Sequence, residues 1–194
     1  MIAAAPDQSR FVYEGLDFRN FIWVALALII MIMSITTEND WLLRFVHIVT
    51  GVMLTGWDIL MGFIIGPILR RLSFDFRRQF SLRLLPKTLF IMTTLGIIAP
   101  TSGWFLAVRL GYVDLDYPDF WWVIAALAIA TIMSIQGLLI LLPANVRAYL
   151  EMRKENPDPE RVGRILNRYF TVIASQGVMQ VLIVIIMVNF ADGL

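Results

Sequence analysis

Residues 41–69 read WLLRFVHIVTGVMLTGWDILMGFIIGPIL. The stretch is apolar almost throughout and is long enough to cross a hydrocarbon core of about 30 Å as one helix. Two ionisable side chains lie well inside it: His47, the only histidine of the sequence, and Asp58. An ionisable group surrounded by lipid costs several kcal/mol unless it meets a partner or water. The stretch therefore predicts a membrane-spanning helix with a polar site on it.

His47 and Asp58 are predicted to share one face of this helix. Eleven residues separate them, which at about 100° per residue comes within about 20° of three full turns and at about 1.5 Å per residue places them about 16 Å apart. Thr50 and Thr55 fall between them on that face. Gly51 and Gly56 leave room there for a partner backbone, a planar ligand or a file of water. We therefore expect the face to point into the protein.

The composition of the whole chain agrees with a membrane protein. Of its 194 residues, 59% are hydrophobic and 16% are charged, whereas soluble domains average roughly 45–50% apolar and about 25% charged residues. Five stretches are apolar enough to cross a bilayer, at residues 21–36, 41–69, 88–110, 120–142 and 169–190. We expect an all-α integral membrane bundle of five transmembrane helices, forming a single domain over residues 21–194. Residues 1–20 are expected to be a cytoplasmic, interfacial N-terminal segment.

Three features refine the arrangement of these stretches. Residues 74–85 mix arginines with aromatic side chains, which favours a position in the headgroup region. Pro143 follows the fourth apolar stretch and is predicted to end that span. A serine, a glutamine and a glycine recur in residues 134–137 and 175–177, and are expected to pack the last two spans together.

The positions of the basic residues predict the orientation. Fourteen of the sixteen lysines and arginines fall before the first span or in the loops after the second and fourth spans. The opposite side carries only Arg44 and Arg109 among several acidic residues. The positive-inside rule then places the N-terminus in the cytoplasm and the C-terminus outside, in a cell inner membrane. The basic loops are expected to contact anionic lipid headgroups, and no nucleic acid.

His47 and Asp58 admit several functions. A neutral imidazole suits haem or copper, although one histidine needs further ligands from a methionine or a second subunit. His47 and Asp58 also suit a proton relay, or hydrogen bonds to the two ends of a quinone. Arg44 and Arg109 lie near the outer end of the face and are further candidates for cofactor binding.

A structural interpretation stands beside these functions. His47 would satisfy a polar contact near the interface, and Asp58 would pair with a hydroxyl or amide of another span. The sequence has no cysteine, which excludes disulfides and thiolate metal sites. It also lacks a P-loop, a dinucleotide-binding glycine motif, a nucleophile elbow and a zinc-protease motif, so no soluble type of enzyme is indicated.

Several segments resemble a known group of membrane proteins. Residues 42–52, LLRFVHIVTGV, are similar to the Leu-Leu-Arg-Trp-x-His-x-x-x-Gly opening of the membrane domain of bacterial urate oxidases of the membrane-bound type, and to the His-bearing helix of copper-resistance D-type proteins. Residues 66–71, 142–149 and 176–180 resemble segments of small membrane proteins near these families. The resemblance implies a redox or metal-related role for His47. The Trp-Ile-Gly that usually follows the histidine is replaced by residues 53–57, MLTGW, and the additional histidines are absent.

Together these observations predict a membrane protein that is not a soluble type of enzyme. We expect an accessory or structural subunit of a redox or metal-handling membrane complex, with protein partners or a second copy of the chain, and with His47 as the haem or copper contact. The alternative is a small transporter or channel-like protein for protons, copper or a small metabolite. A second alternative is a haem-binding membrane oxidoreductase.

Overall fold

The computed structural model describes residues 19–192, and within that range the chain is helical without a β-strand. The elements are α1 (Asn20–Thr36), α2 (Asp40–Ile59), η1 (Leu60–Ile65), α3 (Gly66–Arg71), α4 (Phe74–Arg109), η2 (Tyr112–Asp114), α5 (Phe120–Gln136), η3 (Gly137–Leu141), α6 (Leu142–Met152) and α7 (Pro159–Asp192). The predicted interfacial segment lies outside the described residues, except for Arg19 and Asn20.

Four continuous helical stretches are long and apolar enough to cross a membrane: Asp40–Arg71, Phe74–Arg109, Phe120–Met152 and Pro159–Asp192. The remaining apolar helix, α1, is shorter, with 17 residues. The predicted all-α, membrane-type bundle is thus confirmed. At about 1.5 Å per residue, α1 is about 25 Å long and α4 about 54 Å long.

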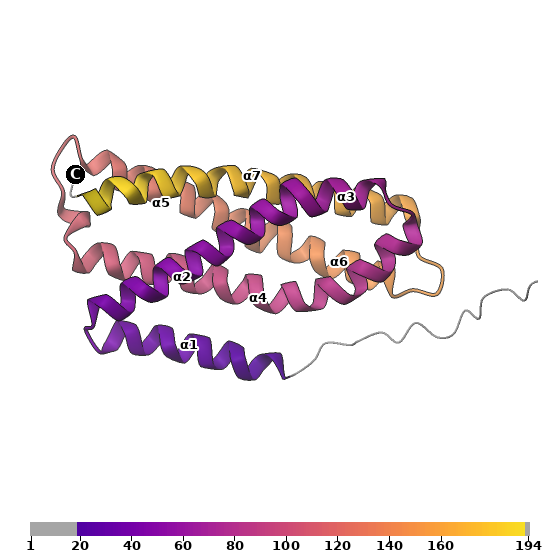
Figure 1. Cartoon of the computed structure of the whole chain (residues 1–194), viewed down its shortest axis with the longest axis horizontal. Helices are drawn as coiled ribbons and strands as arrows, with labels where there is room; N and C mark the ends of the chain where they lie inside the picture. The colour runs from indigo at the N-terminus through magenta and orange to yellow at the C-terminus, as the bar shows by residue number, and fades with distance from the viewer. Residues whose placement is uncertain (1–18, 193–194) are drawn as a thin grey trace, which may run out of the picture.

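The helices run antiparallel along one long axis (Figure 1). The α1–α2 and α4–α5 connections and the end of α7 lie at one end, and the α3–α4 and α6–α7 connections lie at the other. We call the first the acidic end, because it carries Glu38, Asp40, Asp114, Asp116, Asp119 and Asp192. The second is the basic end, which carries Arg70, Arg71, Arg77, Arg78, Arg153, Lys154, Arg161 and Arg164.

Two short π-helical segments carry the chain past prolines that would otherwise break a helix. Segment η1 precedes Pro67, and η3 precedes Pro143. Proline lacks an N–H and crowds the carbonyl of the residue four positions earlier, and a widened turn relieves that conflict. The prediction that the fourth span ends at Pro143 is therefore wrong, because the helix continues through α6 to Met152.

Residues 74–85 also differ from the prediction. They form the opening turns of α4 rather than a separate helix, and the helix continues through Pro86 and Pro100 to Arg109; their predicted position in the headgroup region stays a prediction. Buried side chains on these turns, among them Leu82 and Leu85, pack against α6 and α7. Tertiary packing outweighs the local effect of proline here.

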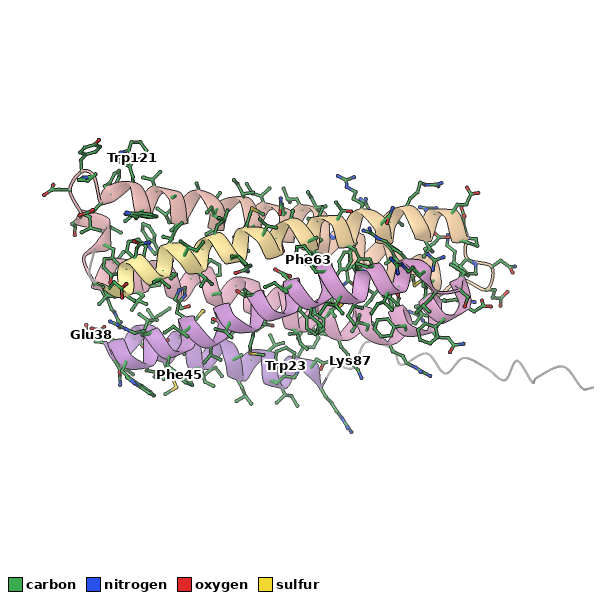
Figure 2. The ribbon with its side chains drawn as sticks, turned by 45° about the horizontal axis from the view of Figure 1, so that its top comes forward. Trp23, Glu38, Phe45, Phe63, Lys87 and Trp121 are labelled. Atoms are coloured by element: carbon green, nitrogen blue, oxygen red, sulfur yellow. The ribbon has the colours of Figure 1, made fainter. Side chains whose placement is uncertain are left out.

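The largest buried apolar cluster of the described chain lies toward the basic end. It joins η1, α3, the start of α4, α6 and the start of α7 through Met61, Leu69, Leu82, Leu85, Ala148, Tyr149, Met152, Val162, Leu166, Tyr169, Phe170 and Ile173. The other two clusters have three buried residues each. Figure 2 shows Trp23, near the start of α1, and Lys87 near the middle of the long axis, and Glu38 and Trp121 at the acidic end. The closely packed part of the bundle at the basic end therefore extends beyond the start of α1.

Candidate functional site

Asp58 is buried where α2 meets α7. Its side chain, in the last turn of α2, is 1% exposed. The side chain of Gln180 on α7 hydrogen-bonds with the carboxyl group. One carboxyl oxygen, Oδ1, is buried without a hydrogen-bond partner. A buried acceptor without a partner costs about 1–3 kcal/mol, and more when it is charged. This unmet oxygen makes Asp58 the strongest candidate for binding a proton or a small cation.

Glycines allow α7 to approach this part of the chain closely. A β-carbon on Gly62 would lie 2.7 Å from the Ala174 Cα, and one on Gly66 would lie 2.9 Å from the Phe170 ring. A β-carbon on Gly177 would lie 3.6 Å from the backbone carbonyl of Asp58. The Gly-x-x-x-Gly spacing of residues 62–66 is a known signal for close helix packing in membranes. None of the predictions from the sequence used that spacing.

Gln180 joins Asp58 to a hydroxyl one turn earlier on α2. The Thr55 hydroxyl lies 3.0 Å from Oε1 of Gln180 and 2.8 Å from the Gly51 carbonyl oxygen, and its single proton serves these two acceptors. With Oε1 occupied in this way, the amide nitrogen of Gln180 is the group that donates toward the carboxylate. Thr55, Asp58 and Gln180 thus form one polar unit between two helices.

A second polar unit lies on the basic side of Asp58. Asn145 Nδ2 donates to Thr88 Oγ1 over 3.0 Å, and the Thr88 hydroxyl donates to the Leu85 carbonyl oxygen, also over 3.0 Å. The Tyr169 side chain is 5% exposed, hydrogen-bonds with Asn145 and Thr88, and lies close enough to Asp58 to interact with its charge. This unit joins α4, α6 and α7. Its residues are far apart in the sequence, and none of them stands out alone.

His47 lies against α4, in the half of α2 that is nearer the acidic end. Its Nδ1 is 3.0 Å from the Ala99 carbonyl oxygen and 3.4 Å from the Ser102 hydroxyl oxygen. The ring rests on Gly103, where a β-carbon would lie only 2.6 Å from Cε1. Because the carbonyl oxygen can only accept, Nδ1 carries the proton in the neutral ring, and Nε2 keeps its lone pair. Metal-binding histidines are held in the same way, with the ring nitrogen that does not bind the metal donating to a carbonyl or carboxylate oxygen.

His47 and Asp58 point into the protein but do not form a single site. Helix α2 crosses the bundle obliquely (Figure 1), so its inner face meets α4 near His47 and α7 near Asp58. The helix is continuous from Asp40 to Ile59, which keeps the predicted separation of about 16 Å. Gly51 and Gly56 have open space where a β-carbon would be added.

The two arginines predicted near His47 lie elsewhere in the contact network. Arg109 donates to the Ile35 carbonyl oxygen and forms an ion pair of 3.4 Å with Asp40. It thereby ties the ends of α1, α2 and α4 together. Arg44 is exposed. The contacts of Arg109 therefore indicate a structural role, in which it holds three helices together at the acidic end.

The described chain offers a metal ion little beyond His47. Over residues 19–192, no group of three or more His, Cys, Asp or Glu side chains is placed to hold a metal ion. Haem or copper at His47 would therefore need ligands of another type or from a partner chain.

One member of the recurring serine–glutamine–glycine segments joins the last two spans. Gln176 Nε2 on α7 donates to the Met133 carbonyl oxygen on α5 over 2.9 Å.

Comparisons of the chain with protein-family models, with curated proteins and with solved structures find no match. The resemblance to membrane-bound urate oxidases and copper-resistance D-type proteins stays a prediction.

Proposed function

We propose that this chain is a small transporter-like protein in which Asp58 binds and releases a proton within the bundle. One observation carries the proposal: a carboxyl group that is 1% exposed has one oxygen without a hydrogen-bond partner. A proton on that oxygen removes the cost of burying an uncompensated charge. A purely structural aspartate is expected to have both oxygens satisfied. Intramembrane acids with unmet bonding capacity are typical of proton pathways.

The polar groups on either side of Asp58 suit a path for the proton. Toward the basic end lie the hydroxyls of Tyr169 and Thr88, bridged by Asn145. Toward the acidic end lie Gln180 and Thr55. Hydroxyl groups both donate and accept hydrogen bonds, which allows them to pass a proton along. The apolar helices around them separate the path from lipid.

The proposal includes a topology. With α1 as a fifth span, the five helices place the α3–α4 and α6–α7 loops, with their arginines, on one side of the membrane. The positive-inside rule then makes the basic end cytoplasmic, in a cell inner membrane. At about 25 Å, α1 is slightly short for a hydrocarbon core of about 30 Å, a mismatch that local thinning accommodates.

Proton flux into liposomes tests this function. The purified chain is reconstituted with a pH-sensitive dye inside the vesicles, and a potassium diffusion potential drives protons inward. We expect flux with the natural chain and no flux above empty liposomes with Asp58→Asn. Asp114→Asn, which changes an exposed acid at the acidic end, is the matched control and should keep the flux. Equal flux in the two variants would contradict the proposal.

His47 supports a second candidate, an accessory subunit of a redox or metal-handling complex. Its Nδ1 is held by the Ala99 carbonyl oxygen, which leaves Nε2 for a ligand. The missing ligands would then come from a partner chain or a second copy. An optical spectrum with metal analysis of protein taken from its native membrane tests this candidate, and also the haem-binding oxidoreductase. A Soret band or bound copper that disappears in His47→Ala, but not in Asp58→Asn, would support it.

A further inference from the structure

An open groove at the basic end lies between α3, the start of α4 and the start of α7. Three arginines line it, one from each helix: Arg70, Arg77 and Arg164. Leu166 and Phe170 form part of its floor. The groove is separate from the polar units around Asp58, and the proposed proton path does not use it.

The groove carries an excess of positive charge. Against the three guanidinium groups it has one carboxylate, Glu160, which forms an ion pair of 3.7 Å with Arg164. Arg70 has long contacts, 3.5 Å to the Asn167 carbonyl oxygen and 3.4 Å to the Thr171 hydroxyl. The Nε of Arg77 is buried without a hydrogen-bond partner. The groove therefore presents three guanidinium groups against a single carboxylate, a charge balance that suits an anionic ligand.

The type of donor selects the type of anion. A guanidinium group presents its N–H donors in a planar fork that matches two oxygens of one phosphate or carboxylate. Gly163 stands among the arginines, and an added β-carbon there would meet nothing within 4 Å. The groove thus has space for a tetrahedral group between side chains that can bind it bidentately.

The floor of the groove indicates what is attached to the phosphate. Leu69, Leu166 and Phe170 are buried apolar side chains. Ile68, next to Leu69 on α3, is 50% exposed, so this helix also presents an apolar side chain on its outer surface. A free, fully hydrated anion gains nothing from such a surface, whereas the glycerol and upper acyl chain of a lipid do.

We propose that this groove binds the phosphate of an anionic phospholipid, with the acyl chains running along the apolar face of α3. Basic pockets between membrane helices on the cytoplasmic side are suited to such headgroups. The inference does not depend on proton transfer at Asp58. It depends on the three arginines and the apolar floor.

Native mass spectrometry of the full chain in detergent tests the site. Phosphatidylglycerol is titrated against phosphatidylcholine, and the bound fraction gives a Kd for each. The variant Arg77→Gln/Arg164→Gln is expected to raise the Kd for phosphatidylglycerol about thirtyfold, since each basic residue near anionic lipid contributes a factor of about five. Arg83→Gln/Arg147→Gln, which removes two exposed arginines outside the groove, is the charge-matched control and should change the Kd less than about twofold.

Two further variants make the result independent of folding and of the proton pathway. Gly163→Leu fills the groove without changing charge and suits a helix better than glycine, so it should weaken lipid binding while keeping the helical circular dichroism. Asp58→Asn should bind lipid as the natural chain does. An equal loss of binding in both arginine pairs would overturn the site. Displacement of the lipid by inorganic phosphate at equal concentration would overturn the lipid assignment in favour of a free phosphate.

Discussion

The imidazole of His47 rests directly on Gly103 of the neighbouring helix, with no room for a β-carbon between them. The same ring is anchored by its Nδ1 to the Ala99 carbonyl oxygen, one turn earlier on α4. The close approach and the hydrogen bond therefore depend on each other. Any group added at residue 103 must push the ring away from its anchor.

Gly103→Ala should accordingly destabilise the protein, although alanine is the better helix former. We expect a loss of about 1–3 kcal/mol in the free energy of unfolding, because overpacking displaces the ring and its hydrogen bond. Gly96→Ala on the same helix is the control, since its β-carbon would meet nothing within 4 Å. It should be neutral or stabilising by up to about 1 kcal/mol.

Unfolding in detergent with increasing dodecyl sulfate, followed by circular dichroism, provides the measurement. The double variant His47→Ala/Gly103→Ala should be less destabilised than the sum of its two single variants, because the ring that clashes is gone. Additive losses would show that the contact between residues 47 and 103 does not limit the packing.

Gly62→Ala should weaken the packing of η1 against α7. Its β-carbon would lie 2.7 Å from the Ala174 Cα, and a backbone atom cannot turn aside as a side chain can. A loss of at least about 2 kcal/mol in the unfolding free energy is expected. Gly56→Ala should cost nothing in the same assay, because a β-carbon added there would meet nothing within 4 Å. Similar losses of unfolding free energy in both variants would be evidence against close packing of η1 and α7 at Gly62.

Asp58→Leu/Gln180→Leu should raise stability while abolishing function. The double variant removes a buried oxygen that has no partner together with the amide that hydrogen-bonds with the same carboxyl group, and replacing a whole buried polar pair by apolar residues stabilises by up to about 1–4 kcal/mol. Thermal unfolding and proton flux on the same preparation would separate the two effects. A lower melting temperature would instead indicate that the contact between Asp58 and Gln180 stabilises the packing of α2 against α7.

Tyr169→Phe tests the polar unit of Tyr169, Asn145 and Thr88. The substitution removes one hydroxyl and keeps the buried ring, so we expect a cost of about 1 kcal/mol in unfolding free energy and a slower proton flux. Tyr117→Phe removes the hydroxyl of an exposed tyrosine and should change neither quantity. Unaltered flux in Tyr169→Phe would remove this unit from the proposed path.

The sequence was sufficient for the features that the bilayer itself imposes. A chain in lipid must satisfy its backbone internally, so long apolar stretches predicted helices, and the burial of Asp58 followed from the cost of exposing it to lipid. Helix tilt was not predictable, because it depends on neighbouring helices. The sequence placed His47 and Asp58 on one face, but the oblique path of α2 gives them different partners.

The two units around Asp58 show the same limit. Thr88, Asn145 and Tyr169 come from three helices, and nothing local in the sequence brings them together. Pro143 predicted the end of a span, yet the packing of α6 keeps that segment helical. The glycine spacing of residues 62–66 could be recognised in the sequence, but the sequence did not indicate that α7 is the helix packed against it.

The uneven distribution of buried side chains has a consequence for how the molecule comes apart. Helix α5 has one buried residue, Val123, whereas the apolar cluster toward the basic end has twelve. Lipid must therefore provide most of the lateral contacts of α5. Harsh detergents, which remove that lipid, should separate this helix from the bundle first. Hydrogen–deuterium exchange should show faster exchange of the α5 backbone amides while the amides of the arginine-rich end stay protected. Unfolding would then begin at α5 and reach the arginine-rich end last.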